Sequence, residues 1–494
     1  RLKPVRVAPP SHIALLSTVI VHPSFTTRCD DSNHLHVPAY AISYLRGLLR
    51  TVGPVNANFR AAFDFSKSSS SSFGRGSSNS IDNMNDDDSD HITGGFVESQ
   101  LLWKNATDFW AVFGWACRCA AEHPQRWQYW RVWLDFVIEA MERDWDERLS
   151  KDIASGKTSK GKSAPAYPLL RESLLVTFLA DLERQRKNIE REVLRALFAF
   201  CNDHSATHLY YKEVFKKETA TIKSQNKRKR ADAVVDLEND RFGDYFDDYD
   251  YDDYDDDDDD DDADGQDEIS ASASRPKKKG RKHKSETAIS SFNLTDTVAE
   301  SIPLRLRIFR LLSAAAYYIS DVFMPVDELY EKFTDELRKL PLPVFRLFIQ
   351  SHTSILPRMV QVTLLRVVAN NLLPHNKPDP AEVDPNHGSC SDLTQLIMTE
   401  CYLPFAAKFT NTEDNAKLSM TLESLMWYLF DQIEIKYSDE LCNAVETGIR
   451  AREGRIPRRA GRMSAADKQA REALARSAEN LRALLDVLAA AAKK

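Results

Sequence analysis

At 494 residues the chain is long enough for two to four ordinary domains, and its 43% hydrophobic and 10% aromatic shares suffice for sizeable cores. Its 16 glycines are few for a fold built of strands and tight turns, so the composition favours helices. No run of 18 apolar residues is present, so we expect no membrane span, and seven scattered cysteines argue against a disulfide framework and for a reducing compartment.

The formal net charge of −8 is distributed unevenly along the chain. Residues 240–268 contain 18 acidic side chains and one base, Arg241, so the remainder carries a net charge of +9. We therefore expect a mildly basic folded part, which permits contact with nucleic acid without requiring it.

Residues 1–64 contain two short amphipathic segments, at residues 12–21 and 37–52, that predict N-terminal helices. Residues 65–95 are rich in Ser, Asn and Asp. They cannot bury enough apolar surface to offset chain entropy, so we expect a disordered loop there.

Residues 96–220 form a Trp-rich helical block that holds seven of the eight tryptophans: Trp103, Trp110, Trp115, Trp127, Trp130, Trp133 and Trp145. From Trp127 to Trp145 the large apolar residues recur at steps of three or four, which puts most of them on one helix face. This spacing favours a packed core over an aromatic platform for a ligand, although Trp133 lies off the stripe and could face a partner. A basic loop at residues 150–164 precedes predicted helices at residues 169–182, 189–201 and 208–218.

Residues 221–290 lack the regularly spaced apolar residues of a helix that packs on a core, so we expect a disordered insert whose charge is basic, then acidic, then basic. Residues 291–449 then predict a second helical block, which could pack with the first. Its expected helices, with prolines such as Pro303 at their edges, span residues 302–323, 326–337, 344–352, 357–373, 392–409, 415–435 and 438–449. Residues 450–494 predict a basic linker and a last helix with Ser464 as its N-cap.

The insert carries three charged clusters with candidate functions. Its acidic run has two interpretations: a solvating spacer, or a mimic of nucleic-acid charge that binds histones or other basic proteins, with interleaved tyrosines as apolar anchors. That run consists of Asp255, Asp256, Asp257, Asp258, Asp259, Asp260, Asp261 and Asp262. Two flanking basic clusters suit nuclear import, and their alternative role is to balance the acidic charge. They comprise Lys227, Arg228, Lys229 and Arg230, and then Lys277, Lys278, Lys279, Arg281 and Lys282.

Catalytic and metal-binding patterns are weak in this sequence. Cys117, Cys119 and His123 could be combined with Cys201 and its neighbouring histidines, but Cys117 and Cys119 would point to different faces of a helix. No phosphate-binding glycine loop, nucleophile elbow or zinc-protease motif is present. We expect no cofactor, no metal and no small-molecule substrate.

The expected fold is therefore all-α, an irregular array of helical hairpins resembling a HEAT- or TPR-like solenoid or a bundle, interrupted by a disordered charged insert. The preferred function is a non-enzymatic nuclear scaffold or adaptor that binds other nuclear proteins in chromosome maintenance or chromatin assemblies. The first alternative is a DNA- or RNA-associated factor in ribosome biogenesis or DNA repair, and the second is an unrecognised enzyme. Candidate nucleic-acid contacts for the first alternative are Arg452, Arg455, Arg458, Arg459 and Arg462.

Overall fold

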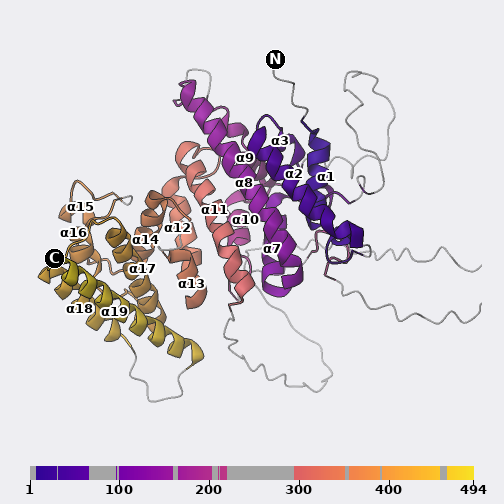
Figure 1. The fold of residues 1–494 in the computed structure, drawn as a ribbon. Helices are drawn as coiled ribbons and strands as arrows, with labels where there is room; N and C mark the ends of the chain where they lie inside the picture. The colour runs from indigo at the N-terminus through magenta and orange to yellow at the C-terminus, as the bar shows by residue number, and fades with distance from the viewer. Residues whose placement is uncertain are drawn as a thin grey trace, which may run out of the picture. The chain divides into compact units, whose positions relative to one another are not determined.

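The computed structural model describes residues 7–29, 32–65, 96, 100–159, 165–202, 210, 212–219, 294–350, 355–389, 392–456 and 464–493. Within these residues the secondary structure is helical throughout, without a strand, which confirms the predicted all-α array (Figure 1). The charged insert and the predicted loop at residues 65–95 lie outside the described residues, apart from Phe65, which is described and buried.

The N-terminal helices agree closely with the prediction from spacing. They are α1 (Pro10–Val21), α2 (Val37–Thr51) and the single turn α3 (Phe59–Ala62). Proline stands in the first turn of both α1 and α2, where its missing N–H costs no helical hydrogen bond. α1 packs against α2, α3 and the long helix α8.

The Trp-rich block consists of α6 (Leu102–Asn105), α7 (Phe109–Glu122) and α8 (Pro124–Ala154). α8 lies at the centre of this block, since it contacts α1, α2, α7, α9 and α11 (Figure 1). It continues past the predicted loop start at residue 150. Lys151 there pairs with Glu147 one turn earlier, with an Nζ–Oε1 distance of 2.6 Å, and so extends the helix.

Two shorter helices follow, α9 (Leu174–Arg184) and α10 (Ile189–Phe198). The predicted helix over residues 169–182 is divided at Ser173, whose side chain caps α9 after a 3₁₀ turn at Leu170–Glu172. The helix predicted over residues 208–218 is wrong for the described residues, because residues 212–219 form bends and a turn and only Tyr210 is in a 3₁₀ helical conformation. Two side-chain interactions explain this: Glu213 accepts the backbone N–H of Glu218 and Thr219, and Glu218 itself turns into the core.

The second block begins with α11 (Asp296–Tyr318), α12 (Val326–Arg338), α13 (Leu342–Ile349) and α14 (Arg358–Leu372). α11 starts earlier than predicted because the Thr295 hydroxyl caps it by accepting from the Val298 N–H at 3.2 Å. Pro303 therefore lies inside α11, and its predicted position at a helix edge is wrong.

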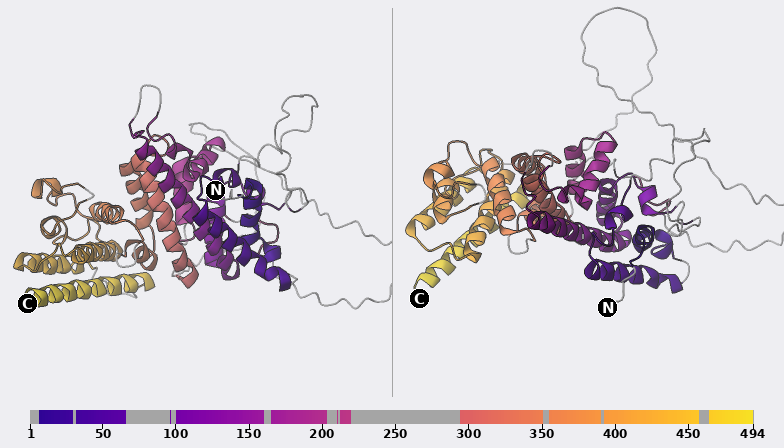
Figure 2. Two further views of the ribbon diagram at one scale, coloured as in Figure 1. Left: turned by 45° about the horizontal axis from the view of Figure 1, so that its top comes forward. Right: turned by 90° about the horizontal axis from the view of Figure 1, so that it is seen from above.

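The remaining helices are α15 (Pro380–Val383), α16 (Gln395–Ile397), α17 (Thr412–Asp431), α18 (Asp439–Glu453) and α19 (Ala465–Ala492). A π-helical turn, Met398–Tyr402, continues α16, so the helix predicted over residues 392–409 is much shorter than expected. Ser464 caps α19 as predicted, with the Asp467 N–H donating to its hydroxyl at 3.0 Å. α17 and α19 lie side by side (Figure 2).

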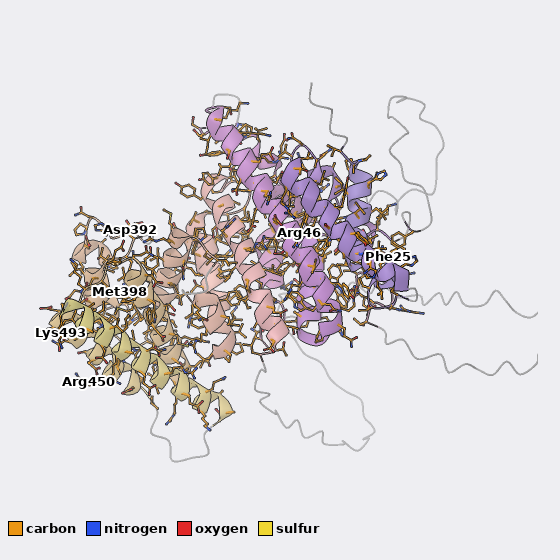
Figure 3. All side chains as sticks on the ribbon, in the orientation of Figure 1. Phe25, Arg46, Asp392, Met398, Arg450 and Lys493 are labelled. Atoms are coloured by element: carbon orange, nitrogen blue, oxygen red, sulfur yellow. The ribbon has the colours of Figure 1, made fainter. Side chains whose placement is uncertain are left out.

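The two helical blocks share one continuous hydrophobic core and form one compact unit. Buried Arg305 of α11 joins them by donating to the carbonyl oxygens of Leu197 and Ala199 at the end of α10. Polar bridges add to this core: Asp135 of α8 accepts from both Arg46 of α2 and Arg307 of α11, each at 2.6 Å. Arg46 is labelled in Figure 3, where the side chains cover the described helices.

Candidate functional site

Of the charged residues predicted as functional sites, the structure describes two, Arg452 and Arg455. Both candidate import clusters, the acidic run at residues 255–262, and Arg458, Arg459 and Arg462 lie outside the described residues. Arg455 is exposed after α18. Arg452 is 0% exposed, so its predicted contact with nucleic acid is wrong.

Arg452 has a structural role instead. Its Nη1 donates to the carbonyl oxygens of Leu403 at 3.0 Å and Phe405 at 3.1 Å, and so ties α18 to the chain after the π-helical turn. Burial lowers the pKa of this guanidinium to about 10. Gly448 permits the close approach, because a Cβ there would lie 1.7 Å from the Leu403 oxygen.

The described residues do not carry the basic excess expected from the sequence. They contain 42 lysines and arginines and 43 aspartates and glutamates, a formal net charge of −1. The prediction of a mildly basic folded part therefore fails for the described residues. The positive charge that partly offsets residues 240–268 lies outside both that stretch and the described residues, where 23 lysines and arginines face 13 acids.

The tryptophans of α6, α7 and α8 form core and do not form an open aromatic platform. All seven are at most 4% exposed, and Trp133, expected as a partner contact, is 0% exposed. Its indole N–H donates to the Ser17 hydroxyl at 2.9 Å, which explains how an off-stripe tryptophan is buried without an unsatisfied donor. The interpretation of the stripe as core is confirmed.

One buried polar cluster stands within this aromatic core. The Glu218 carboxylate accepts from Arg126 Nη2 at 2.7 Å, Trp130 Nε1 at 2.6 Å and Trp115 Nε1 at 3.1 Å. Arg126 also donates to the Thr26 hydroxyl at 2.6 Å. The cluster thus joins α7, α8, the turn after α1 and the 212–219 segment, and we call it the Glu218 cluster.

Sequence reasoning missed the Glu218 cluster because Glu218 stood at the end of a predicted helix. The spacing of residues does not predict that Glu218 is buried, because its hydrogen-bond partners lie 88 to 103 residues away in the sequence. Every donor in the cluster has an acceptor, so it anchors the chain where the insert begins and offers no open coordination position.

The thiols considered for zinc are buried in the same core. Burial raises the pKa of Cys117 to about 12 and also raises the pKa of Cys201, which disfavours the thiolate that a metal needs. Across the described part of the chain, no group of three or more His, Cys, Asp or Glu side chains is placed to hold a metal ion. Nor does any described helix combine the length and apolar character required to cross a bilayer.

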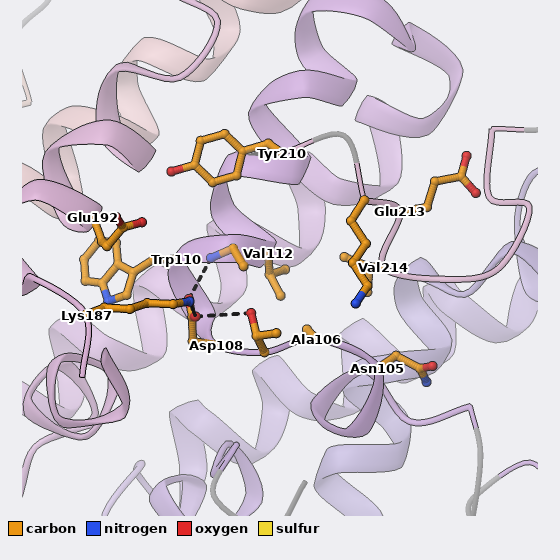
Figure 4. Close-up of a pocket in the computed structure, with 13 residues that line it drawn as sticks. Asn105, Ala106, Asp108, Trp110, Val112, Lys187, Glu192, Tyr210, Glu213 and Val214 are labelled. Atoms are coloured by element: carbon orange, nitrogen blue, oxygen red, sulfur yellow. Dashed lines mark hydrogen bonds and ion pairs between the residues drawn. The ribbon is translucent and has the colours of Figure 1, made fainter. Parts of the chain in front are cut away.

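A pocket of about 290 Å³ opens at the start of α7, beside the 212–219 segment (Figure 4). Asp108 caps α7 by accepting the Ala111 N–H at 2.8 Å, and its second oxygen accepts from Lys187 Nζ at 3.0 Å. Glu213, also in the lining, holds the turn that precedes the insert. These charged groups bind one another and backbone N–H groups. We therefore interpret the pocket as space around the N-terminal cap of α7 and not as a ligand site.

Comparison of the chain with family models, curated proteins and solved structures finds no match.

Proposed function

We propose that this protein is a non-enzymatic nuclear scaffold whose helical body displays charged segments to other nuclear proteins. The observation that supports this most directly is the segregation of charge. The described body carries a net charge of −1, whereas residues 240–268 alone carry −17. A body with a net charge near zero exerts little long-range attraction on charged partners, so that attraction comes mainly from the charged segment.

The partners that fit residues 240–268 are basic proteins such as histones. Eight consecutive aspartates resemble a nucleic-acid backbone in charge density, and tyrosines at positions 245, 249, 251 and 254 supply apolar contact beside them. Charge-dominated association of this kind is fast and weakens as salt rises.

The test compares the full chain with a variant in which a Gly/Ser linker of equal length replaces residues 240–268. Binding to purified core histones is measured by fluorescence anisotropy at two salt concentrations. We expect the linker variant to lose at least tenfold in affinity. A control with the order of residues 240–268 scrambled keeps the charge and should bind almost normally. Equal binding by the parental chain and the linker variant would refute the proposal.

The two basic clusters flanking the acidic run are proposed to direct nuclear import. A fluorescent fusion with alanines at residues 227–230 and 277–282 should remain in the cytoplasm, whereas a variant with lysine and arginine exchanged at those positions should enter the nucleus. Equal nuclear accumulation of both variants would contradict this role.

A second candidate function is association with DNA or RNA, in ribosome biogenesis or DNA repair. It is favoured by the basic excess outside both the described residues and residues 240–268, where 23 lysines and arginines face 13 acids. Binding would then depend on the connecting segments, including Arg458, Arg459 and Arg462. Replacing these three arginines by glutamine should weaken binding to duplex DNA and reduce its salt dependence, and unchanged affinity would remove them as contacts.

A further inference from the structure

The C-terminal end of α17 holds a β-branched residue in a left-handed backbone conformation. Ile433 has φ +59° and follows the cap residue Gln432. Its N–H donates to the Phe430 oxygen at 3.0 Å, and the next N–H, of Glu434, donates to the Leu429 oxygen at 3.0 Å. This is the helix-ending position that glycine usually occupies, and a branched Cβ is strained there.

Packing within the chain does not compensate for this strain. The Ile433 side chain is 85% exposed, while Ile435, two residues later, is 4% exposed and anchors the turn. The two aromatic residues with positive φ do gain packing: Phe200 is 6% exposed, and the Tyr167 ring centroid lies 5.3 Å from that of Tyr318. Arg186 and Lys217 also have positive φ and are exposed, but neither is β-branched. Ile433 therefore costs stability without contributing to the core.

Two further exposed apolar residues are next in sequence to the residues that hold this turn. Gln395 clamps it to α16, because Gln395 Nε2 donates to the Lys436 oxygen at 2.9 Å and the Lys436 N–H donates back to Gln395 Oε1 at 2.7 Å. Leu396, which follows Gln395, is 48% exposed, and Tyr437, which follows Lys436, is 40% exposed. Leu396, Ile433 and Tyr437 are called the Ile433 patch below.

The surroundings of the patch are acidic. Residues 431–440 contain four acids and one base, and all four acids are exposed: Asp431, Glu434, Asp439 and Glu440. The two acids at the end of α17, Asp431 and Glu434, stand where the helix dipole disfavours negative charge. Arg358 of α14 offsets part of this charge, 3.9 Å from Glu434. Ile433, Asp431 and Glu434 thus each depart from a local preference, and such departures concentrate at functional sites.

We propose that the Ile433 patch is a docking site for a basic, amphipathic segment of a partner protein. The partner's apolar side chain would cover Ile433, and its lysines or arginines would meet the surrounding carboxylates. Charge complementarity selects this occupant over an acidic one. The inference deepens the proposed scaffold function by giving the helical body a second, separate contact for basic partners.

The test uses two helical peptides with the same leucine positions, one with lysines and one with glutamates elsewhere. Affinity is measured for the full chain and for the variant with a Gly/Ser linker in place of residues 240–268, so that the acidic run does not mask the patch. Ile433→Gly and Glu434→Lys should each raise the Kd of the lysine peptide about tenfold or more. Neither should lower the melting temperature, because each change suits the end of a helix.

Tyr40→Ala is the matched control, because Tyr40 is 74% exposed but lies on α2. It should leave the affinity unchanged. Equal binding of the lysine and glutamate peptides, parental affinity in both patch variants, or self-association abolished by Ile433→Gly would each overturn the proposal. Loss of histone binding on replacing residues 240–268, with peptide binding retained, would separate the patch from the acidic run.

Discussion

Removing the Glu218 carboxylate should be among the most destabilising single changes in this protein. Glu218→Ala leaves the Arg126 guanidinium, whose side chain is 3% exposed, without a counter-charge. Breaking a buried ion pair in this way costs about 3–5 kcal/mol. The indole N–H groups of Trp115 and Trp130 would also lose their acceptor, at roughly 1–3 kcal/mol for each buried donor left unsatisfied.

These contributions are not additive, because the three donors share one carboxylate. A total loss of about 4 kcal/mol or more is the expectation, which is a large part of the roughly 5–15 kcal/mol of a typical domain. Urea unfolding followed by tryptophan fluorescence measures the loss. Trypsin cleavage after Lys216 and Lys217 reports whether the segment carrying Glu218 detaches first.

The matched control is Glu122→Ala, which removes the exposed partner of Arg118 and should cost about 0.5 kcal/mol or less. A second variant, Arg126→Met with Glu218→Leu, removes both charges and should recover much of the stability lost by Glu218→Ala. The reasoning is refuted by a Glu218→Ala protein within about 1 kcal/mol of the parental chain that also shows parental cleavage.

Four further substitutions test other local features. Gly448→Ala should lower the free energy of unfolding in urea by about 3 kcal/mol or more, because the new Cβ would lie 1.7 Å from the Leu403 oxygen. Its control is Gly47→Ala in α2, where no atom lies within 4 Å of the new Cβ, and this change should raise the free energy of unfolding by about 0.5–1 kcal/mol. Ile433→Gly should stabilise by about 1 kcal/mol in the same assay, since glycine relieves the strain at φ +59°. Burial is the main cause that lowers the pKa of His22 below its usual 6.5, so the unfolded chain binds a proton at this residue more readily than the folded chain. The free energy of unfolding should therefore fall as the pH drops below about 6.5. His22→Gln should reduce this loss of stability between about pH 7.5 and 5.5.

Each of these has a result that contradicts it. Equal effects of Gly448→Ala and Gly47→Ala would mean that the contact with Leu403 relaxes at little cost. A destabilised Ile433→Gly protein would show that the isoleucine packs in solution. For the pH dependence, exposed His375 supplies the control: His375→Gln should leave the acid-induced loss intact, and a flattened profile in that variant would remove the assignment to His22.

The sequence alone predicted the elements that depend on local chemistry. The spacing of apolar residues placed α2, α12 and α14 within one or two residues of their observed ends, and the Ser464 cap of α19 followed from its hydroxyl. It also identified the tryptophan stripe of α8 as core. These features could be predicted because the interacting groups lie within one or two helical turns of one another.

Only the tertiary structure decided which polar and apolar side chains are buried. Arg452 read as a surface cation in a basic stretch, yet carbonyl oxygens nearly 50 residues earlier hold it inside. Glu218 was predicted at the end of a helix, yet it is buried and its donors come from α7 and α8. Ile433 was predicted within the helix over residues 415–435, but α17 ends at Asp431 and the Ile433 side chain is exposed to solvent.

The physical reason is the range of the interactions. Helix formation is governed by neighbours three or four residues away, whereas burial of a charge requires partners that only the folded chain brings together. The formal charge of the whole chain followed from composition. Its division into a balanced helical body and charged connecting segments became visible once the helices had been placed.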